Sequence, residues 1–220
     1  MNDKSVSVKG TFDILYKFYG PQGWWPAKTR LEVIVGAILT QNTAWANVEK
    51  AIANLRSKNA ISSIDSLHRI SGAKLASLIR PAGYYNIKSK RLKNFVSFLH
   101  RRYGGSLKSL ARRNTKDLSG ELLNINGIGP ETRDSILLYA FERPVFVIDA
   151  YTKRIFSRHG LFKEDISYDL AQRFFIGNLP DDKTIFNEFH ALIVRLAKDF
   201  CKKSPKCAGC PLEGREITCK

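Results

Sequence analysis

The chain has 220 residues, 44% of them hydrophobic, and a formal net charge of +16, so it is long enough for one large or two small folded domains. This excess of positive charge favours a polyanionic partner. A membrane surface is less favoured as the partner, because no basic amphipathic helix stands apart from the rest of the chain. The longest apolar run, Val33 to Leu39, is too short to span a bilayer, and Met1 to Gly10 is too polar for a signal peptide, so we expect a cytoplasmic protein without a membrane partner.

The hydrophobic pattern of the first half predicts a series of helices. Residues 31–40 are apolar on most sides, which is typical of a buried helix. Thr43 is expected to cap the next helix with its side chain. The apolar stripe of that second helix is Trp45, Val48, Ile52 and Leu55. Further helical patterns follow at residues 63–70, 72–80, 87–102, 106–112 and 115–123.

The second half continues the helical pattern. Pro130 suits a first helical position, and its helix is expected to reach about Phe141. Asp149 and Ser167 are each expected to cap a later helix, the first of which ends before Gly160. A long last helix has one apolar face, made of Ile185, Phe189, Leu192 and Leu196. No segment alternates as a sheet strand would, so the predicted fold class is all-α.

A turn with two glycines, Gly127-Ile128-Gly129, joins two of the predicted helices. Glycine permits the positive φ of a tight hairpin, and the backbone N–H groups that open the following helix then face outward. Such a hairpin binds a phosphate without reading sequence, whereas the alternative is an ordinary helix–helix turn. The apolar residues around it, Leu123, Ile125 and Ile128, favour a hairpin that packs between helices.

Four cysteines lie in the last twenty residues with the spacing Cys-x5-Cys-x2-Cys-x8-Cys. This clustering is unlike a disulfide framework spread over a secreted domain. Four thiolates suit a metal centre, and by ligand type alone zinc and an iron–sulfur cluster are alternatives. The predicted ligands are Cys201, Cys207, Cys210 and Cys219.

Several motifs together resemble the helix-hairpin-helix DNA glycosylases of the endonuclease III superfamily. They are Leu123 to Leu137 followed by Val147-Ile148-Asp149, then Leu39 to Thr43, Gly83 to Lys90, and the terminal cysteines. The resemblance implies two helical domains with a DNA cleft between them. One is a six-helix domain with the hairpin at residues 28–142, and the other combines residues 1–27 with 143–220 and carries a [4Fe–4S] cluster loop.

Asp149 matches the essential aspartate of that family. Cleavage of an N-glycosidic bond builds positive charge on the sugar, and a carboxylate stabilises that charge and helps to orient water. A plain helix cap is the alternative role for Asp149. Bifunctional relatives carry a lysine at the position of Glu131, and a carboxylate cannot form an imine, so we expect hydrolysis without lyase activity.

The aromatic residues are similar to those of the 3-methyladenine DNA glycosylase branch. In that branch, aromatic side chains at the positions of Trp25 and Trp45 line the base pocket, and a glutamate stands at Glu131. A flipped base stacks on flat faces, and an electron-poor alkylated base gains more from electron-rich rings. The alternative is that these tryptophans belong to the core.

Extrusion of a base leaves a gap that family members fill from two loops. The matching residues are Gln41, whose amide can bond to the orphaned base, and Tyr84, whose ring can stack in the gap. Without that role, Gln41 is a helix-terminal polar residue and Tyr84 a loop aromatic. Lys202 and Lys203 are expected to contact phosphates, or else to form a solvated charge run.

The sequence therefore predicts a monomeric, nucleoid-associated enzyme of base-excision repair. Its expected partner is double-stranded DNA with a damaged base, above all an alkylated purine such as 3-methyladenine, which it releases to leave an abasic site. The alternatives are a glycosylase for mismatched or deaminated bases (T/G or U/G) and a helix-hairpin-helix protein that binds DNA without catalysis.

Overall fold

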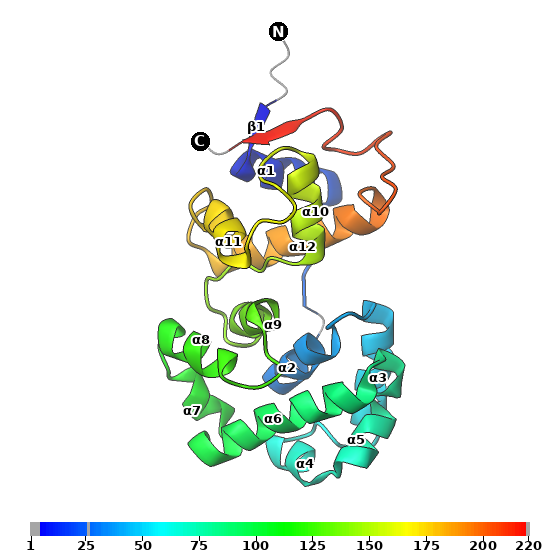
Figure 1. The fold of residues 1–220 in the computed structure, drawn as a ribbon, viewed down its shortest axis with the longest axis vertical. Helices are drawn as coiled ribbons and strands as arrows, with labels where there is room; N and C mark the ends of the chain where they lie inside the picture. Colours follow the sequence, from blue (N-terminus) through cyan, green and yellow to red (C-terminus); the bar gives the residue numbers. More distant parts are fainter. Residues whose placement is uncertain (1–4, 26, 219–220) are drawn as a thin grey trace. The chain divides into compact units, whose positions relative to one another are not determined.

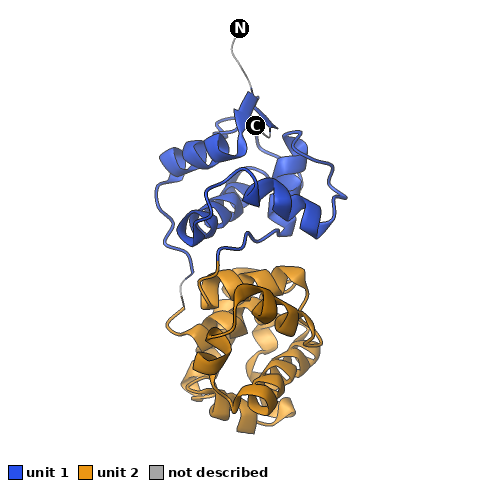
Figure 2. Ribbon diagram, turned by 90° about the vertical axis from the view of Figure 1, so that its left-hand side faces the viewer, with its two compact units in different colours: residues 1–26, 144–220 blue, residues 27–143 orange. Residues whose placement is uncertain are grey.

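The computed structural model describes residues 5–25 and 27–218, and the chain forms two compact units. Unit 1 combines Met1–Pro26 with Pro144–Lys220, and unit 2 is the continuous segment Ala27–Arg143 (Figure 2). The junctions expected from the sequence, after residues 27 and 142, each differ from these by one residue. Unit 1 is therefore assembled from both ends of the chain, with unit 2 inserted between them.

Unit 2 is built from helices only (Figure 1). It has eight α-helical segments where the resemblance implied six. They are α2 (Arg30–Leu39), α3 (Trp45–Ser57), α4 (Ile64–Arg69), α5 (Gly72–Leu78), α6 (Tyr85–Tyr103), α7 (Leu107–Ala111), α8 (Thr115–Leu123) and α9 (Pro130–Ser135). A 3-10 turn at Arg80–Ala82 (η1) precedes α6, and a π-helical turn at Ile136–Ala140 (η2) follows α9.

The helix α2 is the centre of the unit 2 core. Each of its residues from Leu31 to Leu39 is buried, as the apolar sequence predicted. The long helix α6 packs beside it and buries Leu92, Phe95 and Leu99. Side chains of α6 also bond to the loop that follows α2 and to the turn that precedes α6. They hold both segments from inside the protein.

Unit 1 packs four helices around aromatic side chains. Its elements are β1 (Ser5–Ser7), α1 (Val8–Tyr19), α10 (Ala150–Arg158), α11 (Tyr168–Ile176), α12 (Lys183–Asp199) and β2 (Glu216–Thr218). The stacked rings of Phe146 and Phe175, 4.2 Å apart, lie against Phe189 of α12. This core fixes the segment before α10 against α12.

The two ends of the chain meet in a short parallel pair of strands. Ser5, Val6 and Ser7 of β1 pair with Glu216, Ile217 and Thr218 of β2 (Figure 1). With this pair as the only sheet in the described residues, the all-α fold class is confirmed.

Two local predictions are wrong, and one helix was not predicted. Thr43 does not cap α3: Ala44 is the N-cap and makes no side-chain bond, because the Thr43 hydroxyl bonds to Ala82 instead. The helix from Pro130 is not continuous, since α9 gives way to the π turn. The helix α1 was missed because only three residues, Val8, Thr11 and Leu15, form its buried stripe.

Among the helices in the described parts of the chain, none combines the length and hydrophobicity that crossing a membrane requires.

Candidate active site

Asp149 lies at the N-terminus of α10 in unit 1. The buried segment Phe146 to Ile148 leads into it, and Ile148 N–H donates to the Tyr168 hydroxyl at 3.3 Å. The Asp149 carboxylate caps the helix as predicted: Oδ1 accepts from Thr152 N at 2.7 Å and from Thr152 Oγ1 at 2.8 Å. These two bonds fix the carboxylate plane and leave Oδ2 for another partner.

That partner is His190, in the middle of α12. Its Nε2 lies 3.5 Å from Asp149 Oδ2, and the two side chains are 8% and 13% exposed. Burial alone would raise the pKa of Asp149, but the bonds from His190 and Thr152 outweigh it and hold that pKa below its ordinary value. The site therefore keeps a carboxylate that is shielded from water and negatively charged at neutral pH.

The sequence analysis did not identify His190. It lies one turn after Phe186 and one turn before Ile193, both buried, so it stands on the inward face of α12. A histidine at a buried position of an amphipathic helix needs a polar partner, which is the signal that the sequence offered.

One glycine of the unit 2 hairpin has a backbone conformation that other residues rarely adopt. Gly127 has φ +97°, and a Cβ there would lie 2.2 Å from Arg91 Cγ, so only glycine fits. Gly129 has φ −90° and open space around it, so the positive φ of the hairpin comes from Gly127. Ile128 is buried as expected, whereas the flanking Leu123 is 40% exposed.

The structure joins Gln41 to this hairpin. Gln41 Nε2 donates to Gly127 O at 3.0 Å and to Thr132 Oγ1 at 2.8 Å, and Arg91 donates to Gln41 Oε1. Two of these bonds hold Gln41 against the hairpin and α9, and the third joins it to α6. Tyr84, by contrast, projects outward with 68% of its surface exposed.

The predicted pocket residues divide between the units. Trp25 belongs to unit 1 and is half-buried. Trp45 and Glu131 belong to unit 2, where Trp45 is half-buried on α3 and Glu131 is exposed in the first turn of α9. Trp45 is therefore less buried than Val48, Ile52 and Leu55, its companions on the apolar stripe.

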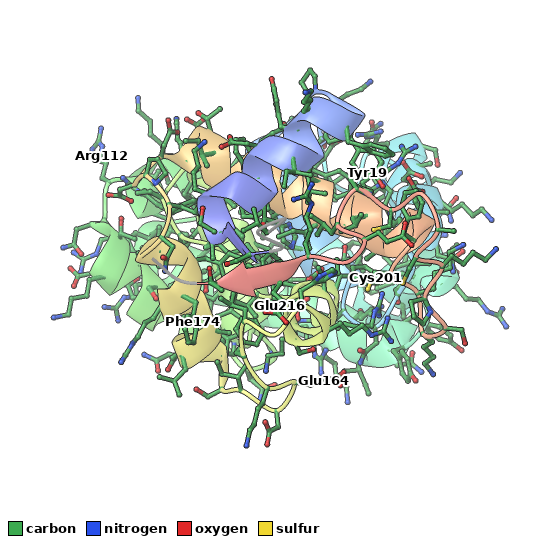
Figure 3. The ribbon with its side chains drawn as sticks, turned by 90° about the horizontal axis from the view of Figure 1, so that it is seen from above. Tyr19, Arg112, Glu164, Phe174, Cys201 and Glu216 are labelled. Atoms are coloured by element: carbon green, nitrogen blue, oxygen red, sulfur yellow. The ribbon has the colours of Figure 1, made fainter. Side chains whose placement is uncertain are left out.

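The cysteine segment follows α12. Cys201 is buried just beyond the helix end (Figure 3), and it borders a cavity of about 370 Å³ together with Cys207 and Cys210. Burial, and then the neighbouring Cys207 and Cys201 sulfurs, raise the pKa of the Cys210 thiol. No three His, Cys, Asp or Glu side chains within the described residues converge as ligands of one ion, and Cys219 lies outside those residues.

Two arginines of α10 clamp this segment. Arg158 donates to Cys201 Sγ at 3.3 Å and to the carbonyl oxygens of Lys202 and Lys203 at 2.6 and 2.9 Å. Arg154 donates to Cys201 O at 2.8 Å. The side chains of Lys202 and Lys203 are exposed beside the clamp.

Comparison with known proteins agrees with this arrangement. Residues 35–180 match the family described as HhH-GPD superfamily base excision DNA repair protein. A Methanocaldococcus jannaschii protein that carries the name of a DNA repair glycosylase is 51% identical over 212 residues, which are 96% of each chain.

Two solved structures have the same fold. The Helicobacter pylori 3-methyladenine DNA glycosylase bound to 1,N6-ethenoadenine is 28% identical, with a TM-score of 0.74 over 88% of this chain and 98% of that one. An endonuclease III in a non-covalent complex with DNA is 20% identical, with a TM-score of 0.79 over 94% of each chain. The predicted resemblance is thus confirmed: the chain belongs to the HhH-GPD superfamily and is a DNA glycosylase of base-excision repair.

Proposed function

We propose that the protein is a monofunctional N-glycosylase that removes an alkylated base, with 3-methyladenine as the first candidate, and leaves an abasic site. The observation that carries this proposal is the Asp149 carboxylate, held unprotonated by Thr152 and His190. A protein that only binds DNA has no use for a shielded negative charge of this kind.

The chemistry follows from that charge. The bond between C1′ and the base nitrogen breaks, and both bonding electrons leave with the base. The sugar gains oxocarbenium character, which a nearby carboxylate stabilises. A water oxygen then bonds to C1′, and its proton passes to Asp149 or to solvent. Alkylated purines suit this route because they already carry positive charge and leave readily.

The substrate class is supported by two observations. The 28% identical H. pylori protein is named as a 3-methyladenine DNA glycosylase, and its structure holds an adenine derivative. Trp25, Trp45 and Glu131 match the residues of that branch. A thymine-DNA glycosylase shares the fold with a TM-score of 0.70 but only 19% identity, so mismatched or deaminated bases are the second candidate.

A panel of duplexes with single lesions tests the substrate. It contains 3-methyladenine, ethenoadenine, uracil opposite guanine and thymine opposite guanine, and released free base is measured by chromatography. We expect the alkylated adenines to be released fastest. Faster release of uracil or thymine would move the chain to the second class.

The absence of lyase activity is a separate part of the proposal. Glu131 offers no amine, and Lys153 of α10, four residues after Asp149, donates its Nζ to Ile166 O at 2.5 Å. Reduction with borohydride is therefore expected to trap no covalent complex with a lesion duplex. A trapped wild-type complex would identify a nucleophilic amine elsewhere and contradict this part alone.

DNA is expected to bind to the hairpin and the neighbouring loops. The Gly127-Ile128-Gly129 turn supplies phosphate contacts, Gln41 and Tyr84 fill the gap left by the flipped base, and Lys202 and Lys203 add phosphate contacts. The protein acts on duplex DNA as a monomer in this proposal.

The cysteine segment is proposed to hold a [4Fe–4S] cluster. Three thiols border one cavity, and Arg158 already directs an N–H toward Cys201 Sγ, which suits a thiolate ligand. Zinc, which four thiolates also suit, is the alternative. Analysis of purified protein should give about four iron and four sulfide per chain, whereas one zinc and no sulfide would favour the alternative.

A further inference from the structure

Lys88 is a buried cation whose three partners lie in, or at the edge of, two loops. It is 1% exposed. Its Nζ donates to Leu39 O at 2.8 Å, to Thr43 Oγ1 at 2.5 Å and to Ala82 O at 2.7 Å. An ammonium group has three donors and no acceptor, so these bonds use all of its protons.

The partners lie in or next to two loops. One is the Gln41 loop (residues 40–44), which begins directly after Leu39, the last residue of α2. The other is the Tyr84 turn (residues 82–84), which leads into α6. Thr43 Oγ1 also donates to Ala82 O at 2.5 Å, so the two loops are bonded to each other as well as to Lys88.

Both loops carry a side chain that the proposed function sends into the duplex. Tyr84 has φ +45° and ψ +31°, a left-handed conformation that a bulky residue keeps only where its surroundings hold it. Arg91, one turn along α6 from Lys88, donates to the Gln41 side chain. One face of α6 therefore contacts both loops from inside the protein.

We propose that Lys88 is a positioning residue that fixes the Gln41 loop and the Tyr84 turn in one register, so that both side chains enter the DNA gap together. The inference rests on the proposed function, because it assumes that these two residues fill the gap. Lys88 itself does not touch DNA or the reacting atoms.

The first test follows DNA distortion without catalysis. A duplex with 2-aminopurine opposite a tetrahydrofuran abasic analogue reports unstacking of the orphaned base through its fluorescence. Saturating wild-type protein is expected to change this fluorescence. Lys88→Met is expected to lose most of the change while its affinity, measured by anisotropy, falls by less than about tenfold, because phosphate contacts dominate affinity.

Lys93 provides a matched control on the same helix. Its Nζ donates to the backbone carbonyls of Leu67 and His68 at 3.1 and 2.7 Å, on the side of α6 that faces α4. Lys93→Met removes an ammonium group that is also hydrogen-bonded to backbone carbonyls but is only partly buried and lies away from both loops. It is expected to keep the wild-type fluorescence change even where it lowers the melting temperature.

Thr43→Val keeps the test decisive if Lys88→Met does not fold. This change preserves the shape of the side chain and removes the hydroxyl that bonds to both Lys88 and Ala82. Loss of the fluorescence change in Thr43→Val or Lys88→Met, but not in Lys93→Met, supports the inference. An unchanged signal in a folded Lys88→Met protein, an equal loss in the Lys93→Met protein, or no signal with wild type would each overturn it.

A kinetic comparison separates this inference from the proposed function. Under single-turnover conditions, Lys88→Met is expected to slow base release from a stacked lesion about a hundredfold, since small misplacements have effects of this size. For the same lesion in an unpaired loop, which needs little extrusion, the loss should be below about threefold. Equal losses on both substrates would count against Lys88 as a positioning residue, whereas no release by wild type from any lesion would reject the proposed function.

Discussion

At the scale of single residues, Asp149 has a structural task and a proposed chemical one. Its Oδ1 caps α10 through Thr152, and its Oδ2 faces His190. The Thr152 bonds that cap the start of α10, together with the His190 contact, also keep the carboxylate charged despite its burial. A helix cap and a catalytic base are therefore compatible roles here, although the sequence presented them as alternatives.

Removal of His190 should move the acidic limb of the reaction. In His190→Ala, burial still raises the pKa of Asp149, but one of the bonds that lower it is gone, so this pKa should rise. Base release is then expected to fall at a higher pH than in wild type. His190→Gln, which keeps an N–H donor, should recover part of the shift, and coincident pH profiles for all three proteins would exclude this role for His190.

The same pair predicts how stability depends on pH. A carboxyl whose folded pKa lies below its unfolded value near 4 stabilises the fold above that unfolded value, and the contribution is lost as the pH falls through the folded pKa. Denaturant unfolding of wild type should therefore show a loss of stability as the pH falls below about 5, and His190→Ala should show only part of that loss. Parallel curves would mean that His190 does not lower the pKa of Asp149.

At the scale of elements, the hairpin depends on Gly127 far more than on Gly129. Gly127→Ala combines a positive φ with a 2.2 Å approach to Arg91 Cγ and should lower the free energy of unfolding by about 2 kcal/mol or more. Gly129→Ala meets nothing within 4 Å at φ −90° and should cost about 1 kcal/mol or less as a weaker helix cap. Denaturant unfolding of both variants makes the comparison, and equal losses would show that the hairpin tolerates a side chain at 127.

Most helices could be predicted because their signals are local. The span of α8 and the caps of α10 and α11 follow from periodicity and capping residues. Thr43 could not be placed, because its hydroxyl bonds to Ala82 and Lys88, which are far along the chain. The exposed Tyr84 and the retracted Gln41 likewise depend on α6 and the hairpin rather than on their neighbours in sequence.

At the scale of the whole molecule, the sequence predicted both junctions of the inserted unit only through the resemblance to a family. No composition shift marks residues 27 and 143, and the strand pair at the chain ends joins residues more than two hundred positions apart. His190 and Lys88 were missed for the same reason: each is defined by partners on other elements. Asp149 could be proposed from the sequence because its motif, Val147-Ile148-Asp149, is contiguous.

The net charge of +16 predicts strongly salt-dependent binding. Each neutralised phosphate releases counterions, so the logarithm of affinity for undamaged duplex should fall with the logarithm of salt concentration, with a slope of about −0.9 per contact. Lys202→Ala and Lys203→Ala together should reduce the slope by about two if both touch phosphate. A slope near zero for wild type would mean that the basic surface does not bind DNA.

The most direct test of the central claim is release of free base from alkylated duplex by wild type and Asp149→Asn. Asparagine keeps the size of the side chain and an oxygen that can cap α10, but it removes the charge. We predict normal folding and DNA affinity with a single-turnover rate about a hundred- to a thousandfold lower. Near-wild-type release by Asp149→Asn would contradict the account, because no step of the proposed reaction would then depend on this carboxylate.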